Sequence, residues 1–331
     1  MTQTLISEWV CESEGVMKKL LKHFFLDKFD AKWSEEPPTG IVWHKSVVIS
    51  NQRVVICSSV LPGKSIVPEY RLPESLIPLL KSNIQKCVRR KIHDKAMKSA
   101  YQLMNIVSDK GKEIGMSNFL RRLSIISLED TVVISAIQTV IWFMVAHSKG
   151  YTLDEKQKRY LLGVLYILID NKTFSRMQWK STNKDIVYND FVKSLTVRKA
   201  YGGMKGDINM IDDAIKHYSY NKPANIPIVR MKVTDLSFNK DDIELSAVDF
   251  HCYPHIISRL VILFPEYSEE HLKQVIWDES SGVNIRLPAY AGNVYLRNGL
   301  FRRLRPHNKV FSEIYEELVK ICLRILGNLS F

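Results

Sequence analysis

The sequence has 331 residues, of which 46% are hydrophobic and 25% are charged. This composition excludes a collagen-like or largely disordered chain, and the length allows one large or two modest domains with a buried core. Basic residues exceed acidic ones and give a formal net charge of +12. An excess of that size favours an anionic partner such as nucleic acid or an anionic membrane surface.

The cysteines and the N-terminus indicate an intracellular protein, either cytoplasmic or nuclear. The five cysteines form no CxxC pair, which argues against a disulfide framework and against a cysteine-built zinc site. The first residues carry acids where a secretory signal would have a basic region. The apolar run 131–147 contains Gln138 and is too short for a confident membrane span, so it predicts a buried helix and no membrane partner.

The first 73 residues predict a helix followed by a β-hairpin. Apolar residues at helical spacing indicate a helix over 5–30, which Pro37 and Pro38 would end. Two runs rich in β-branched residues then lie within 41–60, on either side of Asn51 and Gln52. They predict a small antiparallel β element.

Helices dominate the sequence after Pro73. Asp94, Ser117 and Asp154 each precede an apolar-periodic run, as helix N-caps do. Gly202 and Gly203 interrupt a further helical stretch. The segment 221–248 reads as a connector, and helices are expected again over 253–264, 268–278 (behind Ser268 as N-cap) and 310–326.

The predicted fold class is therefore mainly α, a multi-helix domain with a small N-terminal antiparallel β element. We expect three consecutive regions. They are an N-terminal helix and hairpin (1–73), a helical basic domain (74–220) and a C-terminal helical region with a basic stretch (221–331).

Two short windows supply the positive excess. Residues 81–123 contain eleven basic residues against three acids, and residues 286–309 contain six basic residues and no acid. In the second window the arginines alternate with Tyr290, Tyr295 and Phe301. Guanidinium groups pair with phosphates and aromatic rings stack on unpaired bases, so both windows are candidate nucleic-acid contacts.

The predicted nucleic-acid-binding residues are Lys86, Arg89, Arg90, Lys91, Arg286, Arg297, Arg302, Arg303, Arg305 and Lys309. The alternative is structural: the C-terminal arginines would cap helices and pair with nearby glutamates. For Arg121 and Arg122, a salt-bridge cluster with Glu129 and Asp130 is favoured over ligand binding.

The stretches CVRRKIHDKAMKSAYQLM and FLRRLSIISLED resemble the helical region that follows the ATPase module in clamp-loader-related AAA+ genome-maintenance proteins of the recombination-factor type. The residues in matching places are Arg89, Arg90, Asp94, Ala96, Ala100, Leu103, Phe119, Arg121, Arg122, Leu123, Glu129 and Asp130. The resemblance covers residues 86–130 and implies a region that mediates oligomerisation beside DNA. The ATPase module has no counterpart in this sequence.

Two further clusters are candidate sites. Gly202, Gly203, Lys205 and Gly206 form a candidate phosphate loop, with Asp207 beside it. A glycine turn that joins two helices without any ligand is the alternative. Asp249 and His251 are candidate catalytic residues, although a strand or loop end that enters a helix, with Pro254 in its first turn, explains them without a metal.

The leading hypothesis is a non-catalytic nucleic-acid-binding accessory protein of DNA replication or repair, without a cofactor. A homo-oligomer or a replication-protein partner is compatible with it. The second hypothesis is a metal-dependent nuclease or another phosphate-transfer enzyme, in which Asp207, Asp249 and His251 hold Mg²⁺. The third is an oligomeric structural or assembly protein whose basic patches pack against an acidic partner.

Overall fold

A computed structural model of the chain describes residues 22–49, 51–64, 72–130, 134–170, 190–220, 235–244, 247–248 and 255–273, together with 317, 320–321, 323–325 and 327–328. These residues fall into two compact units. The first combines described residues from 22–64, 134–161 and 190–220, and the second combines those from 72–130, 162–170, 235–248 and 255–273. The units interleave along the chain, and the predicted division into three consecutive regions remains a prediction.

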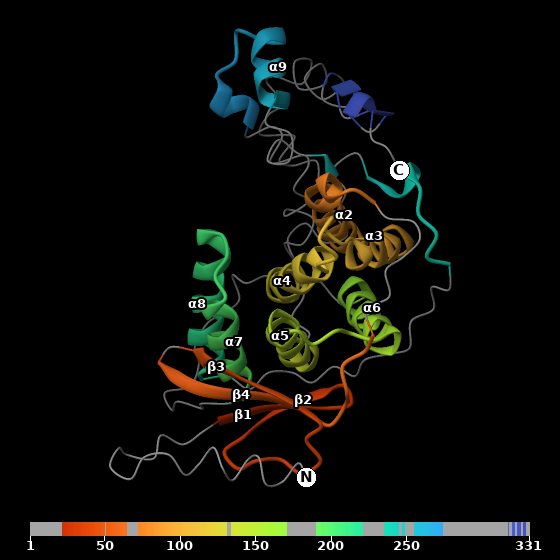
Figure 1. Cartoon of the computed structure of the whole chain (residues 1–331). Helices are drawn as coiled ribbons and strands as arrows, with labels where there is room; N and C mark the ends of the chain where they lie inside the picture. Colours follow the sequence, from red (N-terminus) through yellow and green to blue (C-terminus); the bar gives the residue numbers. More distant parts are fainter. Residues whose placement is uncertain are drawn as a thin grey trace. The chain divides into compact units, whose positions relative to one another are not determined.

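The first unit contains a four-stranded sheet in the order β2-β1-β4-β3 (Figure 1). The strands are β1 (Lys22–Asp27), β2 (Asp30–Ser34), β3 (Trp43–Ile49) and β4 (Gln52–Ser58). The pairs β1–β2 and β3–β4 are antiparallel hairpins, and β1 pairs with β4 in parallel. The sheet is therefore mixed, which corrects the expectation of a purely antiparallel element.

The sheet also corrects the helix predicted over 5–30 from residue 22 onward, because residues 22–34 form a hairpin, and residues 5–21 lie outside the described residues. Phe24 and Leu26 alternate onto the buried face of β1 and are fully buried. Lys28 takes a left-handed backbone conformation (φ 56°) in the tight turn between the two strands. A run of apolar residues suits either a helical stripe or a strand, and pairing with β4 decides in favour of the strand. The hairpin predicted within 41–60 is confirmed.

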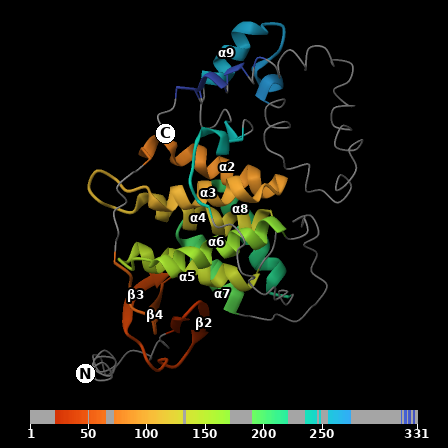
Figure 2. The same ribbon diagram turned by 90° about the vertical axis from the view of Figure 1, so that its right-hand side faces the viewer.

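Helix α5 (Ile134–Ser148) packs on this sheet, as both views show (Figures 1 and 2). The indole of Trp142 donates a hydrogen bond of 2.8 Å to the Phe24 carbonyl. The Thr139 hydroxyl donates a hydrogen bond to the Phe29 carbonyl and accepts one from the Ala31 N–H, and so links α5 to the β1–β2 turn. Residues 136–146 are buried except for the partly exposed Gln138. This confirms the buried helix predicted from the apolar run.

Two more helices complete the first unit. They are α7 (Asp190–Ala200), which packs on α5, and α8 (Lys205–Tyr218), which packs on α7. Helix α6 (Glu155–Asp170) begins in the first unit and ends in the second. Asp154 caps it as predicted: its carboxylate accepts a hydrogen bond of 2.8 Å from the backbone N–H of Gln157.

The second unit is built around α2 (Ile77–Arg90), α3 (His93–Asn105) and α4 (Ile114–Glu129), which lie side by side (Figure 2). The short helices η1 (Glu74–Leu76) and η3 (Lys240–Asp242) and helix α9 (His255–Leu263) belong to the same unit. Gly115 lets α4 start close to the end of α3, because a Cβ at 115 would collide with the Leu103 carbonyl oxygen.

The mainly α-helical fold with a small N-terminal β element is confirmed for the described residues. Asp94 and Ser117 do not cap their helices as predicted, because α3 begins at His93 and α4 at Ile114. Within the described ranges, none of the helices combines the length and the apolar character that a membrane span requires.

Candidate anion-binding pocket

A sharp turn joins α2 to α3 in the second unit. Lys91 takes the left-handed conformation there, with φ 60°, and the N–H of Ile92 donates a hydrogen bond of 2.9 Å to the Cys87 carbonyl. This arrangement closes the C-terminus of α2 in the way that a glycine usually does. A lysine side chain consequently stands at a position where the backbone favours glycine.

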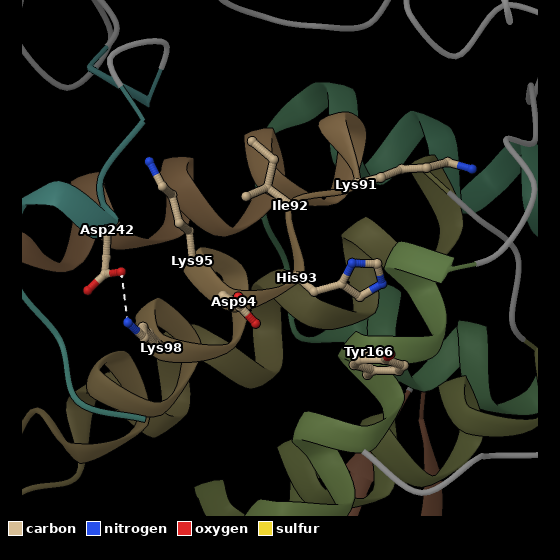
Figure 3. Close-up of a pocket in the computed structure, with 8 residues that line it drawn as sticks. All are labelled: Lys91, Ile92, His93, Asp94, Lys95, Lys98, Tyr166 and Asp242. Carbon is tan, nitrogen blue, oxygen red and sulfur yellow. Dashed lines mark hydrogen bonds and ion pairs between the residues drawn. The ribbon is translucent and has the colours of Figure 1, made fainter. Parts of the chain in front are cut away.

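A cavity of about 700 Å³ opens beside this turn (Figure 3). Three lysines, a histidine, two aspartates, an isoleucine and a tyrosine line it: Lys91, Lys95, Lys98, His93, Asp94, Asp242, Ile92 and Tyr166. Six of the eight come from the turn and the first two turns of α3. Two of the lysines are paired with carboxylates, and Lys91 has no ion pair among the described residues, so Lys91 is the lining cation that favours an anion here.

The N-terminus of α3 contributes to the same electrostatic effect. Its N-cap residue, Ile92, offers no side-chain hydrogen bond to the first-turn N–H groups. Such N–H groups and the helix dipole attract negative charge. Asp94 in the first turn offsets part of this attraction, while Lys95 adds to it.

His93 is held in place at the edge of the pocket. Its Nε2 lies 3.1 Å from a carboxylate oxygen of Asp170, and its ring packs against Tyr166 at 4.8 Å between centroids. Figure 3 shows the imidazole lying over the tyrosine ring. Both partners come from the last turns of α6, so this helix fixes one side of the pocket.

The opposite side of the pocket is formed by an acidic segment, residues 239–244. The Lys98 ammonium lies 3.1 Å from an Asp242 carboxylate oxygen, and the Lys95 ammonium lies 2.6 Å from one of Glu244. Figure 3 shows the first of these pairs, with the Lys91 side chain pointing away from it. Lys91 is exposed and has no ion-pair partner among the described residues.

Two of the residues predicted to bind nucleic acid are buried, which corrects their assignment. The Arg89 side chain is only 5% exposed and pairs with Asp130 at 3.0 Å and Glu129 at 3.1 Å. Burial alone would lower the pKa of Arg89, but the two carboxylates outweigh it and raise that pKa. Lys86 is also buried, at 6% exposure. Neither side chain faces solvent, where a phosphate could reach it.

The carboxylates of the predicted salt-bridge cluster are structural, as expected, but sequence reasoning missed one of their partners. It proposed Arg121 and Arg122 and did not include Arg89, which pairs with Glu129 and Asp130 in the structure. Arg90 is half-buried, so Lys91 is the one fully exposed member of the predicted set that the structure describes.

The glycine loop joins α7 to α8 as a turn. Gly202 and Gly203 both have positive φ, and the buried Arg198 donates a hydrogen bond of 2.7 Å to the Gly202 carbonyl. Lys199 and Asp212 form an ion pair of 2.6 Å between the two helices. These contacts account for the glycines as a helix connection, which was the alternative in the sequence. Lys205, Gly206 and Asp207 begin α8, and their assignment as a phosphate loop remains a prediction.

The other predicted site residues lie outside the described residues: Asp249, His251, Arg286, Arg297, Arg302, Arg303, Arg305 and Lys309. Within the described ranges, no group of three or more His, Cys, Asp or Glu side chains is arranged to hold a metal ion. Sequence reasoning also missed Lys95, Lys98 and His93 as pocket residues. The three-residue spacing of Lys95 and Lys98 on α3 is the signal that could have found these two lysines, because residues at that spacing share a helix face.

A comparison with protein-family models, curated proteins and solved structures finds no match to this chain. The resemblance of residues 86–130 to clamp-loader-related proteins therefore remains a prediction.

Proposed function

We propose that this chain binds nucleic acid through its phosphates, as a non-catalytic accessory protein, and that the pocket between α2 and α3 is one of its contact sites. The observation that carries the proposal is Lys91, an exposed cation in a left-handed turn beside the uncapped N-terminus of α3. DNA replication or repair is the setting that the sequence resemblance suggests.

The backbone at Lys91 shows that its side chain is not needed to form the turn. A left-handed conformation costs a non-glycine residue about 1 kcal/mol, and a glycine would close α2 without that cost. An exposed lysine kept at such a position contributes little packing. Lys28 and Asn51 share this conformation, so the backbone supports the proposal only together with the pocket that Lys91 lines.

The predicted ligand follows from the chemistry of the pocket. Ammonium groups and helix N–H groups bind phosphate oxygens, and phosphate contacts carry no sequence information, so binding through them is independent of sequence. The net charge of +12 adds long-range attraction to any polyanion. Affinity should therefore fall steeply as salt is raised.

The test is a fluorescence anisotropy titration of labelled single-stranded and double-stranded oligonucleotides over a series of salt concentrations. The informative variant is Lys91→Gly, which removes the cation and relaxes the turn. Its matched control is Lys28→Gly, because Lys28 is exposed, has a φ of 56° and lies in the hairpin of the other unit.

We expect Lys91→Gly to weaken binding for all sequences and to reduce the salt slope by about one. Lys28→Gly should leave both quantities close to those of the unchanged protein. Equal losses in the two variants would mean that binding reports net charge alone, and binding without salt dependence would contradict the proposal.

A further inference from the structure

The acidic segment, residues 239–244, is held on α2 and α3 by contacts that do not involve its acidic side chains. The amide of Asn83 on α2 is fully buried. It donates a hydrogen bond of 2.8 Å to the Asp242 carbonyl and accepts one of 2.9 Å from the Glu244 N–H. The same amide donates to Ser99 on α3 at 2.7 Å. The backbone of the segment is therefore anchored independently of its charge.

The segment also orders its own carboxylates. Asn239 and Asp242 form a capping box around η3, in which one Asp242 oxygen accepts a hydrogen bond of 2.8 Å from the Asn239 N–H. The other oxygen of Asp242 accepts a hydrogen bond of 3.1 Å from the Lys98 ammonium, and a carboxylate oxygen of Glu244 accepts one of 2.6 Å from the Lys95 ammonium. Each carboxylate thus forms an ion pair with a lysine that lines the pocket.

These pairs are partly shielded from solvent. The side chains of Lys98 and Asp242 are 18% and 9% exposed, and those of Lys95 and Glu244 are 32% and 24% exposed. Salt screens such pairs less than fully exposed ones. Because the carboxylates are tethered beside the lysines, they compete at a high effective concentration with any phosphate that enters from solution.

We propose that the acidic segment is a built-in competitor for phosphate, which masks Lys95 and Lys98 and leaves Lys91 as the cation open to a ligand. This inference rests on the proposed function. A carboxylate and a phosphate oxygen make the same charge-assisted hydrogen bond to an ammonium group, so only one of them holds each lysine at a time. A dense polyanion that makes several contacts displaces the carboxylates, whereas a single phosphate does not.

The experiment is the same anisotropy titration with a labelled single-stranded oligonucleotide. The test variant is Glu244→Gln, which keeps the N–H that binds Asn83. The matched control is Asp241→Asn, because Asp241 is an exposed acid of the same segment whose side chain has no partner among the described residues. Both substitutions change the net charge equally.

We expect Glu244→Gln to tighten binding by about three- to fivefold and Asp241→Asn by less than about twofold. In a Lys95→Ala background, Glu244→Gln should bring no further gain, because the masked cation is gone. Asp242→Asn is a second test variant, and circular dichroism confirms that each variant keeps its helical content.

The outcomes separate the two proposals. Equal gains from Glu244→Gln and Asp241→Asn, or no gain from either, would overturn the competitor and leave nucleic-acid binding in place. Binding that is detectable only after Glu244→Gln would support a strong competitor. If neither the unchanged protein nor any variant binds the oligonucleotide, the proposed function and the competitor are both overturned.

Discussion

Arg89 and Asp130 form an ion pair of 3.0 Å in which the carboxylate is completely buried and the guanidinium side chain is 5% exposed. The pair joins the last turn of α2 to the end of α4. Gln85 adds a hydrogen bond of 2.7 Å to the neighbouring Glu129. Because Lys91 follows α2 directly, this network fixes the part of the helix from which the pocket turn departs.

Asp130→Asn should strongly destabilise the protein. The substitution removes the ion pair of the buried Arg89 with Asp130 and leaves its pair with Glu129, and breaking a buried ion pair from one side costs up to about 3–5 kcal/mol. Urea denaturation followed by circular dichroism measures the free energy of unfolding. Asp94→Asn is the control, since Asp94 is exposed and should change that free energy by less than about 0.5 kcal/mol. Similar effects from both substitutions would show that the buried pair is not structural.

Lys91→Gly should stabilise the fold by about 1 kcal/mol, because glycine adopts a positive φ without the steric cost that a lysine bears. Lys91→Ala removes the same charge but keeps the Cβ, so it should bring no gain. Thermal denaturation of the two variants separates backbone relief from the loss of charge. A glycine variant less stable than the alanine variant would contradict the argument that the turn is strained.

Asn83→Ala should loosen the acidic segment. The Asp242 carbonyl and the Glu244 N–H lose their buried partner, and unsatisfied polar groups cost about 1–3 kcal/mol each. Hydrogen exchange read by mass spectrometry should become faster over 239–244 than in the unchanged protein. Asn118→Ala is the control, because Asn118 is half-buried and its side chain donates a hydrogen bond of 3.0 Å to the Ile114 carbonyl and accepts one of 3.1 Å from Lys81, neither of which involves the segment. Unchanged exchange in Asn83→Ala would show that other contacts hold the segment.

The stability of the protein should fall in mild acid because of His23 on β1. Burial lowers the pKa of His23 below its ordinary value of 6.5, with partial opposition from a backbone contact to Ser34. Its Nδ1 is buried without a hydrogen-bond partner in the described structure. The unfolded chain therefore binds a proton more readily than the folded one. The contribution of His23 to the free energy of unfolding is complete above pH 6.5. It is lost as the pH falls below 6.5, by at most about 1.4 kcal/mol per pH unit.

Urea denaturation between pH 7.5 and pH 5 measures this dependence. His23→Gln should flatten the curve, whereas His44→Gln, at an exposed position on β3 of the same sheet, should leave it unchanged. Some slope should remain in both variants, because burial also lowers the pKa of His217. Equal slopes in the two variants would exclude His23 as the source.

Local patterns predicted most of the helices but not the strand β1. The run Phe24–Leu26 is compatible with either structure, and its parallel pairing with β4 joins residues about thirty positions apart. Periodicity operates within a few residues and carries no information about such a partner. The break at Gly202 and the cap at Asp154 were predictable because both depend on local backbone chemistry.

The same reasoning explains the errors in the candidate site. Arg89 appeared to be a surface cation because its carboxylate partners lie about forty residues further along the chain. Lys95 and Lys98 are balanced by acids of a segment that the sequence presented only as a connector. Clustered charge indicates where an anion could bind, but the fold decides which of the cations stay available.

The anchoring of the sheet by Trp142 has a consequence for synthesis on the ribosome. This indole bonds to Phe24, 118 positions earlier in the chain. At ordinary translation speeds, roughly ten seconds pass between the emergence of the first strand and that of its covering helix. During that interval the apolar face of the nascent hairpins is open to chaperones.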